Sequence, residues 1–178
     1  MAWNKSMWFH LRMLSGFLVL WTLASCSISL GLAPISSIDY SKVKTVQIAD
    51  FPNHAQYVYG PLATTLNEKL KDMFIQQARL QLVDSGGDLV IDGEITGYNQ
   101  YNESTDASGY ASKVKLTLTV NVSYENTKDH EFDFENKVFS ASQTYDATQL
   151  LTAVQDELIT VMVKDISEQI YNSTIASW

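Results

Sequence analysis

The stretch KVKLTLTVNVSY, residues 113–124, decides how the rest of this sequence has to fold. Apolar residues and Tyr124 alternate with Lys, Thr, Asn and Ser along the whole stretch. Side chains of a β-strand point alternately to its two faces, so the pattern predicts a strand with one buried face and one wet face. A strand with one buried face needs a second layer to cover that face, which predicts a layered domain.

The segments around this strand predict the rest of the sheet. Residues 126–129 form a hairpin turn, and residues 131–141 return as a strand with Phe132, Phe134 and Val138 on its inner face. Pairing of residues 124 and 131 would bring Lys137 opposite about residue 118. Residues 99–109 are polar and predict a loop. Three earlier strands are expected at residues 44–49, 79–83 and 89–101.

Two amphipathic helices are expected to form the second layer. Gly60-Pro61 opens the first, over residues 60–77, and Thr152 with Gln155 forms a capping box for the second, over residues 152–173. Their apolar stripes repeat at steps of three and four residues. The stripes consist of Leu62, Leu66, Leu70, Met73 and Phe74, and of Val154, Leu158, Val161, Met162, Ile166, Ile170 and Tyr171.

The resulting order β-α-β-β-β-β-α predicts an α+β fold. It is a two-layer sandwich, with a mostly antiparallel sheet of four to five strands packed by two helices. The first strand, the first helix and the second strand should form a right-handed parallel crossover.

The first 25 residues are expected to be a signal peptide. A polar start with Lys5 and Arg12 precedes an apolar run at residues 13–24, which is shorter than the roughly 20 residues that a membrane span needs. Leu23, Ala24 and Ser25 then precede Cys26, the only cysteine. This arrangement resembles the lipobox of bacterial lipoproteins, in which the peptide is cut before the cysteine and the cysteine is acylated.

This resemblance implies a permanent lipid anchor, because several acyl chains bind a bilayer far more tightly than one. Ser27, where an Asp would signal retention, implies sorting to the outer membrane, and no acidic run after Cys26 suggests display on the cell exterior. Three parts are therefore expected: signal peptide 1–25, lipidated cysteine and tether 26–40, and folded domain 41–178. The 13 residues at 27–39 reach on the order of 40 Å when extended.

Composition argues against several classes of function. The net charge of −8 disfavours nucleic acid, and removal of Lys5 and Arg12 makes the mature chain more acidic still. His54 and His130 fall in expected loops, and no residue pattern points to a catalytic group, a cofactor or a metal site. We therefore expect a protein that is not an enzyme.

An ordered set of short motifs resembles LptE, the lipopolysaccharide-assembly lipoprotein family, in the form found in Bacteroidota. The set includes FPN at 51–53, LKDMF at 70–74, GEITGY at 93–98, LTLTV at 116–120 and YENTKD at 124–129. The resemblance implies a lipoprotein that sits in the lumen of the LptD-type outer-membrane β-barrel on the periplasmic side, plugs it, helps it assemble and assists lipopolysaccharide insertion into the outer leaflet.

Two groups of residues are candidates for contact with lipopolysaccharide or with the barrel. Lysines could meet the phosphates of a polyanionic lipid, and tyrosines are common anchors at interfaces. The candidates are Lys113, Lys115 and Lys137, and Tyr98, Tyr101 and Tyr110. A solvated strand face is the alternative interpretation of the lysines.

A second function remains open from the sequence. A tethered α+β lipoprotein could instead regulate a peptidoglycan synthase or another envelope enzyme. Such a regulator would need a tether much longer than residues 27–39 in order to cross the periplasm.

Overall fold

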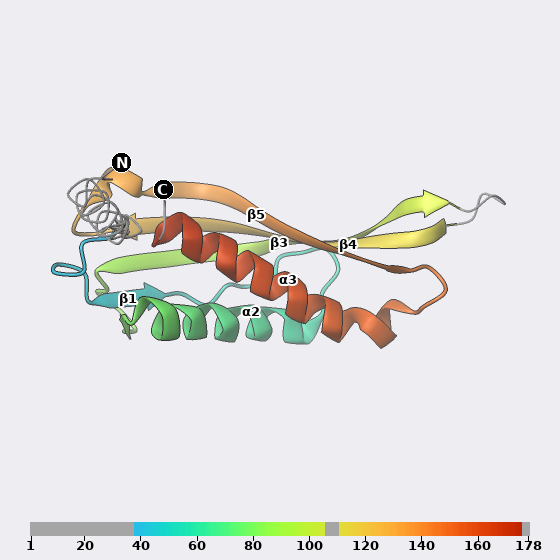
Figure 1. Ribbon diagram of the computed structural model, residues 1–178, viewed down its shortest axis with the longest axis horizontal. Helices are drawn as coiled ribbons and strands as arrows, with labels where there is room; N and C mark the ends of the chain where they lie inside the picture. The colour runs from blue at the N-terminus through green and yellow to red at the C-terminus, as the bar shows by residue number, and fades with distance from the viewer. Residues whose placement is uncertain (1–37, 106–110, 176–178) are drawn as a thin grey trace, which may run out of the picture. The chain divides into compact units, whose positions relative to one another are not determined.

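Residues 113–124 form the middle of a long strand in a five-stranded sheet (Figure 1). The computed structural model describes residues 38–105 and 111–175. The elements are β1 Thr45–Ile48, α2 Gly60–Met73, β2 Gln81–Leu82, β3 Leu89–Thr105, β4 Ala111–Asn126, β5 Phe134–Asp146 and α3 Leu151–Thr174. A π-helical turn, Phe74–Ala78, extends α2, and a short 3-10 helix, His130–Phe132, precedes β5.

The sheet has the order β2-β1-β3-β4-β5 and covers one side of the helix pair. β1 pairs in parallel with both β2 and β3, whereas β3, β4 and β5 pair antiparallel. The predicted element order and the parallel pairing of the first two strands are confirmed. The fold is an α+β sandwich with a mixed, mostly antiparallel sheet packed by two helices.

The core lies between the helices and the inner face of the sheet. Leu116, Leu118 and Val120 of β4 are completely buried, as are Leu62 and Leu66 of α2. The predicted stripe of α2 and the alternation of β4 are therefore confirmed. Full burial of a Leu or Val side chain contributes about 1.5–3 kcal/mol, so these two elements supply much of the stabilisation of the sandwich.

Asp88 ties together the ends of three strands. One oxygen of its carboxylate accepts hydrogen bonds from the backbone N–H groups of Lys44 and Thr45, at 2.8 and 3.0 Å, and from the Thr45 hydroxyl. The other oxygen lies 2.9 Å from the ammonium of Lys128 in the β4–β5 turn. The backbone N–H group of Lys44 holds the pKa of this carboxyl well below its usual range, and Lys128 and Thr45 add to this effect.

Gly93 allows Phe51 to lie against the sheet. A Cβ at position 93 would stand 2.2 Å from the carbonyl oxygen of Asn121 and 2.6 Å from the ring of Phe51. Phe51 is completely buried, and its N–H donates to the side chain of Asn67 on α2. The segment that follows it bridges to β3 through Asn53 and Ile95. Only glycine therefore fits at position 93.

The loop predicted at residues 99–109 is wrong over its first part. β3 continues to Thr105, because its backbone groups pair with β4 through Tyr101↔Lys115 and Thr105↔Ala111. This pairing follows a bulge between Ile95 and Gly97. The two strand ends form a hairpin arm, residues 101–105 and 111–115, which reaches past the start of α3 in Figure 1.

The predicted inner face of β5 is partly wrong. Phe134 faces the core, but Phe132 lies in the 3-10 helix and is 42% exposed, and Val138 is 63% exposed. The cause is a bulge: Tyr124 pairs with Phe134 and Val122 pairs with Lys137, with Asn136 in a left-handed conformation at φ 54°. The extra residue reverses the alternation, so that the buried side chains are those of Phe139, Ala141 and Tyr145.

The start and the buried face of α3 also differ from the prediction. Leu150 is the N-cap residue and no side chain caps the helix, so Thr152 forms no capping box and Gln155 is buried instead. Val161 is 40% exposed, while Ile159 and Val163 are buried. α3 contacts α2 on one side and β5 on the other, which broadens and rotates its buried stripe.

Replacement of Asp88 should destabilise the domain in a way that depends on pH. Asp88→Ala should lower the free energy of unfolding by about 2–3 kcal/mol at pH 7, because it leaves backbone donors without their charged acceptor. Folding lowers the pKa of Asp88. The stabilisation is therefore complete above the pKa that Asp88 has in the unfolded chain, and it is lost as the pH falls through the lower pKa that Asp88 has in the folded domain. Denaturant unfolding of wild type and variant at pH 7 and pH 3 measures the difference, and an unchanged difference at pH 3 would contradict the assignment.

Gly93→Ala should destabilise the domain by about 3 kcal/mol, since the new methyl group meets a backbone carbonyl that cannot move without breaking the sheet. Gly60→Ala is the matched control, because no atom lies within 4 Å of a Cβ placed there. Thermal unfolding of both variants provides the comparison. Equal melting temperatures for the two variants would show that the close approach at Gly93 is not needed.

Candidate functional site

One face of the sheet is not covered by any helix in residues 38–105 and 111–175. It is opposite the buried face of β4, and we call it the open sheet face. Its surface is rich in short polar side chains, which pair across the strands, such as Thr117 with Ser142 at 3.0 Å and Asn121 with Asn136 at 3.2 Å. These residues are Thr117, Thr119, Asn121 and Ser123 of β4, and Ser140, Ser142 and Thr144 of β5. Asp92 and Glu94 of β3 and the exposed Val138 of β5 lie on the same face.

This face is hollowed at a pocket lined in part by Asp92, Asn121 and Ser123, and along β4 and β5 it carries short hydroxyl and amide side chains. They can donate and accept hydrogen bonds in either direction, because a hydroxyl rotates to suit its partner. Such a surface can form hydrogen bonds with a polar protein surface and needs no ion pairs to do so. The open sheet face is therefore suited to contact with another protein, and nothing in its composition suggests catalysis.

Lys113 and Lys115 lie at the end of the open sheet face, where the hairpin arm begins. Lys115 pairs in register with Tyr101 on β3 and with Thr144 on β5, and Lys113 pairs with Asp146. The pKa of Asp146 is lowered, chiefly by its hydrogen bonds from Thr148 and to a smaller extent by Lys113. The charge of Lys113 is thus partly balanced by Asp146.

Tyr101 is the exposed aromatic residue of this end of the sheet. Its side chain is 57% exposed and stands next to Lys115. The structure therefore brings together three of the predicted contact residues, Lys113, Lys115 and Tyr101. Tyr110 lies outside the described residues, as do Cys26 and the residues Leu23, Ala24 and Ser25 before it.

Lys137 does not belong to this group. The bulge in β5 turns it to the helix side of the sheet, opposite Val122, where its ammonium lies 3.3 Å from the hydroxyl of Ser173 on α3. It also lies over the rings of Phe134 and Phe139, at 4.9 and 5.4 Å from their centroids. The predicted position of Lys137 opposite about residue 118 is wrong.

Tyr98 is a core residue and not a surface contact. Its side chain is 1% exposed and its ring stacks on Tyr57 with the centroids 5.6 Å apart. Burial raises the pKa of Tyr98 to about 12. The bulge between Ile95 and Gly97 turns Tyr98 toward the helices, opposite Leu118.

Three potential metal ligands converge near the β4–β5 turn. Glu125, His130 and Asp133 place one ligand atom each within 4.8 Å of one another. His130 is already hydrogen-bonded to Asp133 at 2.6 Å, and this bond raises the pKa of His130. The second oxygen of Asp133 accepts from the N–H of Asn126, so the contacts of this cluster account for the shape of the turn.

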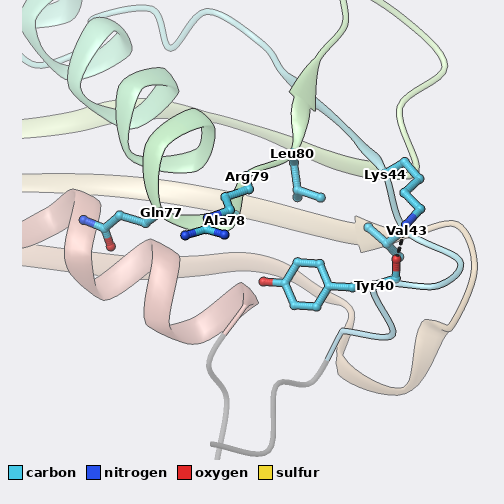
Figure 2. Close-up of a pocket in the computed structure, with 7 residues that line it drawn as sticks. All are labelled: Tyr40, Val43, Lys44, Gln77, Ala78, Arg79 and Leu80. Carbon is cyan, nitrogen blue, oxygen red and sulfur yellow. Dashed lines mark hydrogen bonds between the residues drawn. The ribbon is translucent and has the colours of Figure 1, made fainter.

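The sequence did not indicate a pocket that Figure 2 shows between the start of β1 and the end of the π-helical turn. It has a volume of about 330 Å³ and is lined by Tyr40, Val43, Lys44, Gln77, Ala78, Arg79 and Leu80. Arg79 is the only arginine after Arg12, and this is the one signal that could have drawn attention to it.

None of the helices in the described part of the chain is both long enough and apolar enough to span a membrane. No curated protein matches this sequence.

Several solved structures are similar to this domain, and those with a TM-score of 0.50 or more share its fold. CT253 from Chlamydia trachomatis has a TM-score of 0.52 at 8% identity and covers 74% of this chain and 98% of its own. XCC0632 from Xanthomonas campestris has a TM-score of 0.50 at 13% identity, covering 74% and 85%. Rare lipoprotein B from Shewanella oneidensis has a TM-score of 0.48 at 16% identity, covering 71% and 92%.

A family model described as "LptE: Lipopolysaccharide-assembly" matches residues 43–174, which include every helix and strand of the sandwich. The match covers most of the chain and agrees with the family that the sequence motifs resemble, although it does not distinguish the Bacteroidota form. Proteins of this family are assembly lipoproteins of the cell envelope and not enzymes. The chain belongs to the LptE family of lipopolysaccharide-assembly lipoproteins.

Proposed function

We propose that this protein is anchored in the outer membrane through acylated Cys26 and occupies the lumen of an LptD-type β-barrel from the periplasmic side. There it plugs the barrel, supports its assembly and assists insertion of lipopolysaccharide into the outer leaflet. Signal peptide 1–25, lipidated cysteine and tether 26–40, and folded domain 41–178 are the parts of this proposal.

The open sheet face is the observation that carries the proposal. The inner wall of a large outer-membrane barrel is polar, and a plug needs a rigid surface that can form hydrogen bonds with it without large apolar patches. The Ser, Thr and Asn side chains of the open sheet face meet that need. Their strands are fixed by the core on the opposite face, which gives the surface a constant shape.

The hairpin arm supplies a second contact region in this arrangement. Tyr101 offers an exposed ring beside the ammonium of Lys115. An aromatic ring next to a cation can contact both apolar and anionic groups. We therefore assign Tyr101, Lys113 and Lys115 to the barrel or to lipopolysaccharide phosphates.

Cys26→Ser should yield an unprocessed, unacylated precursor, since a hydroxyl cannot accept the lipid that must be added before the signal is cut. Intact-mass measurement of protein purified from membranes should show the full signal peptide and no acyl chains. Ser29→Ala, a change in the tether that spares the lipobox, should leave processing normal. An acylated, cleaved product from Cys26→Ser would refute the anchor.

Affinity purification of the lipoprotein from detergent-solubilised outer membranes should recover a large β-barrel protein in near-equal amount. A photo-crosslinking amino acid in place of Tyr101 should give an adduct with that barrel after irradiation, and none in an unirradiated sample. Mass spectrometry identifies the partner. Recovery of a peptidoglycan synthase without a barrel would replace the proposal with the regulatory function, and the absence of any barrel would refute it.

A further inference from the structure

The pocket in Figure 2 combines an apolar floor with a basic rim. Val43, Ala78 and Leu80 are 1%, 3% and 4% exposed and form the floor. Lys44 stands at one end in the figure, and Arg79 with Gln77 stands toward the other. The lining includes no carboxylate, which gives this small region a positive charge on a chain of net charge −8.

The two cations of the rim have no acidic partner within the described ranges 38–105 and 111–175. Lys44 donates to the carbonyl oxygen of Tyr40 at 2.5 Å, a neutral acceptor that leaves its charge uncompensated. The side chain of Arg79 makes no ion pair or hydrogen bond within these ranges. By contrast, Lys71 and Lys128 each pair with an aspartate. The rim is therefore free to receive an anion.

The backbone holds Arg79 in an unusual conformation. Its φ and ψ are 55° and 30°, in the left-handed region, at the point where the π-helical turn ends and the chain turns toward β2. Asn and Gly adopt this conformation at lower cost than a residue with a long side chain. A costly backbone geometry that places a guanidinium on the rim of a pocket points to a function for that side chain.

We infer that this pocket binds the phosphate of an anionic glycerophospholipid, with the adjoining acyl segment against the apolar floor. A guanidinium and an ammonium recognise phosphate oxygens by charge-assisted hydrogen bonds, and the buried floor accepts methylene groups that a free anion would not offer. A volume of about 330 Å³ holds a headgroup with part of one chain and excludes a whole lipid.

The position of the pocket in the chain explains why a membrane lipid would reach it. Tyr40 is the last residue of the tether and Val43 follows it closely, so acylation of Cys26 would keep the pocket close to the bilayer surface. This inference rests on the proposed function only for that anchoring. A bound headgroup would fix the orientation of the sandwich relative to the membrane, which acylation of Cys26 alone would not do.

Native mass spectrometry of the full-length protein in a neutral detergent tests the inference directly. Wild type should retain one phosphatidylglycerol molecule and should not retain phosphatidylcholine. Arg79→Asn removes the guanidinium and keeps a residue that tolerates a left-handed backbone; it should weaken retention by about tenfold, as expected for loss of a charged hydrogen bond. Lys44→Gln should also weaken lipid retention.

Lys69→Gln is the matched control, because it removes one exposed charge from α2 without touching the pocket, and it should retain the lipid like wild type. Equal melting temperatures of all variants show that the fold is intact. Equal lipid retention by wild type and Arg79→Asn would overturn the inference. So would displacement of the lipid by millimolar inorganic phosphate, or retention of lipopolysaccharide alone. The native mass spectrum separates the lipoprotein alone from any complex with a barrel, so failure of the barrel proposal would leave this result unaffected.

Discussion

The sandwich depends on the carboxylate of Asp88, which lies where β1 and β3 begin and β4 ends. β1 is a short strand that pairs with β2 on one side and β3 on the other. Four residues provide few ladder hydrogen bonds. Asp88, in the loop before β3, compensates by accepting from the N–H groups of Lys44, just before β1, and of Thr45, its first residue. The carbonyl oxygen of Asp88 also accepts from the N–H and hydroxyl of Thr127, so the same residue fixes the far end of β4.

The local sequence pattern was enough to predict β4 and α2, because each buries one face against a single layer. β4 lies between two antiparallel strands under one helix layer, so its burial follows the alternation of its own sequence. The stripe of α2 is equally self-contained. These two elements determine the fold class, because a one-sided strand and a one-sided helix can only be satisfied by packing on each other.

The sequence predictions fail where pairing with a neighbouring strand decides the direction of a side chain. Asn136 in the left-handed region adds a residue to β5 and moves Lys137 from the open sheet face to the helix side. The bulge after Ile95 likewise turns Tyr98 into the core. Neither bulge leaves a clear local mark, since Asn136 is one polar residue among several and the glycines near Ile95 allow a bend without fixing its place. Two of the six predicted contact residues, Lys137 and Tyr98, therefore lie away from the face on which they were expected.

The two binding regions proposed for this protein lie at opposite ends of the sandwich, as Figure 1 shows for β1 and the tip of the hairpin arm. This separation follows from topology. Antiparallel pairing of β3 with β4 places the hairpin arm as far as possible from the β4–β5 turn, beside which Asp88 holds β1. The chain enters the sandwich next to β1, so lipid contacts made there would not compete with partner contacts on the open sheet face or at Tyr101. A lipoprotein with this arrangement can stay bound at the membrane while its other end engages a partner, and both contacts are fixed by the same rigid sheet.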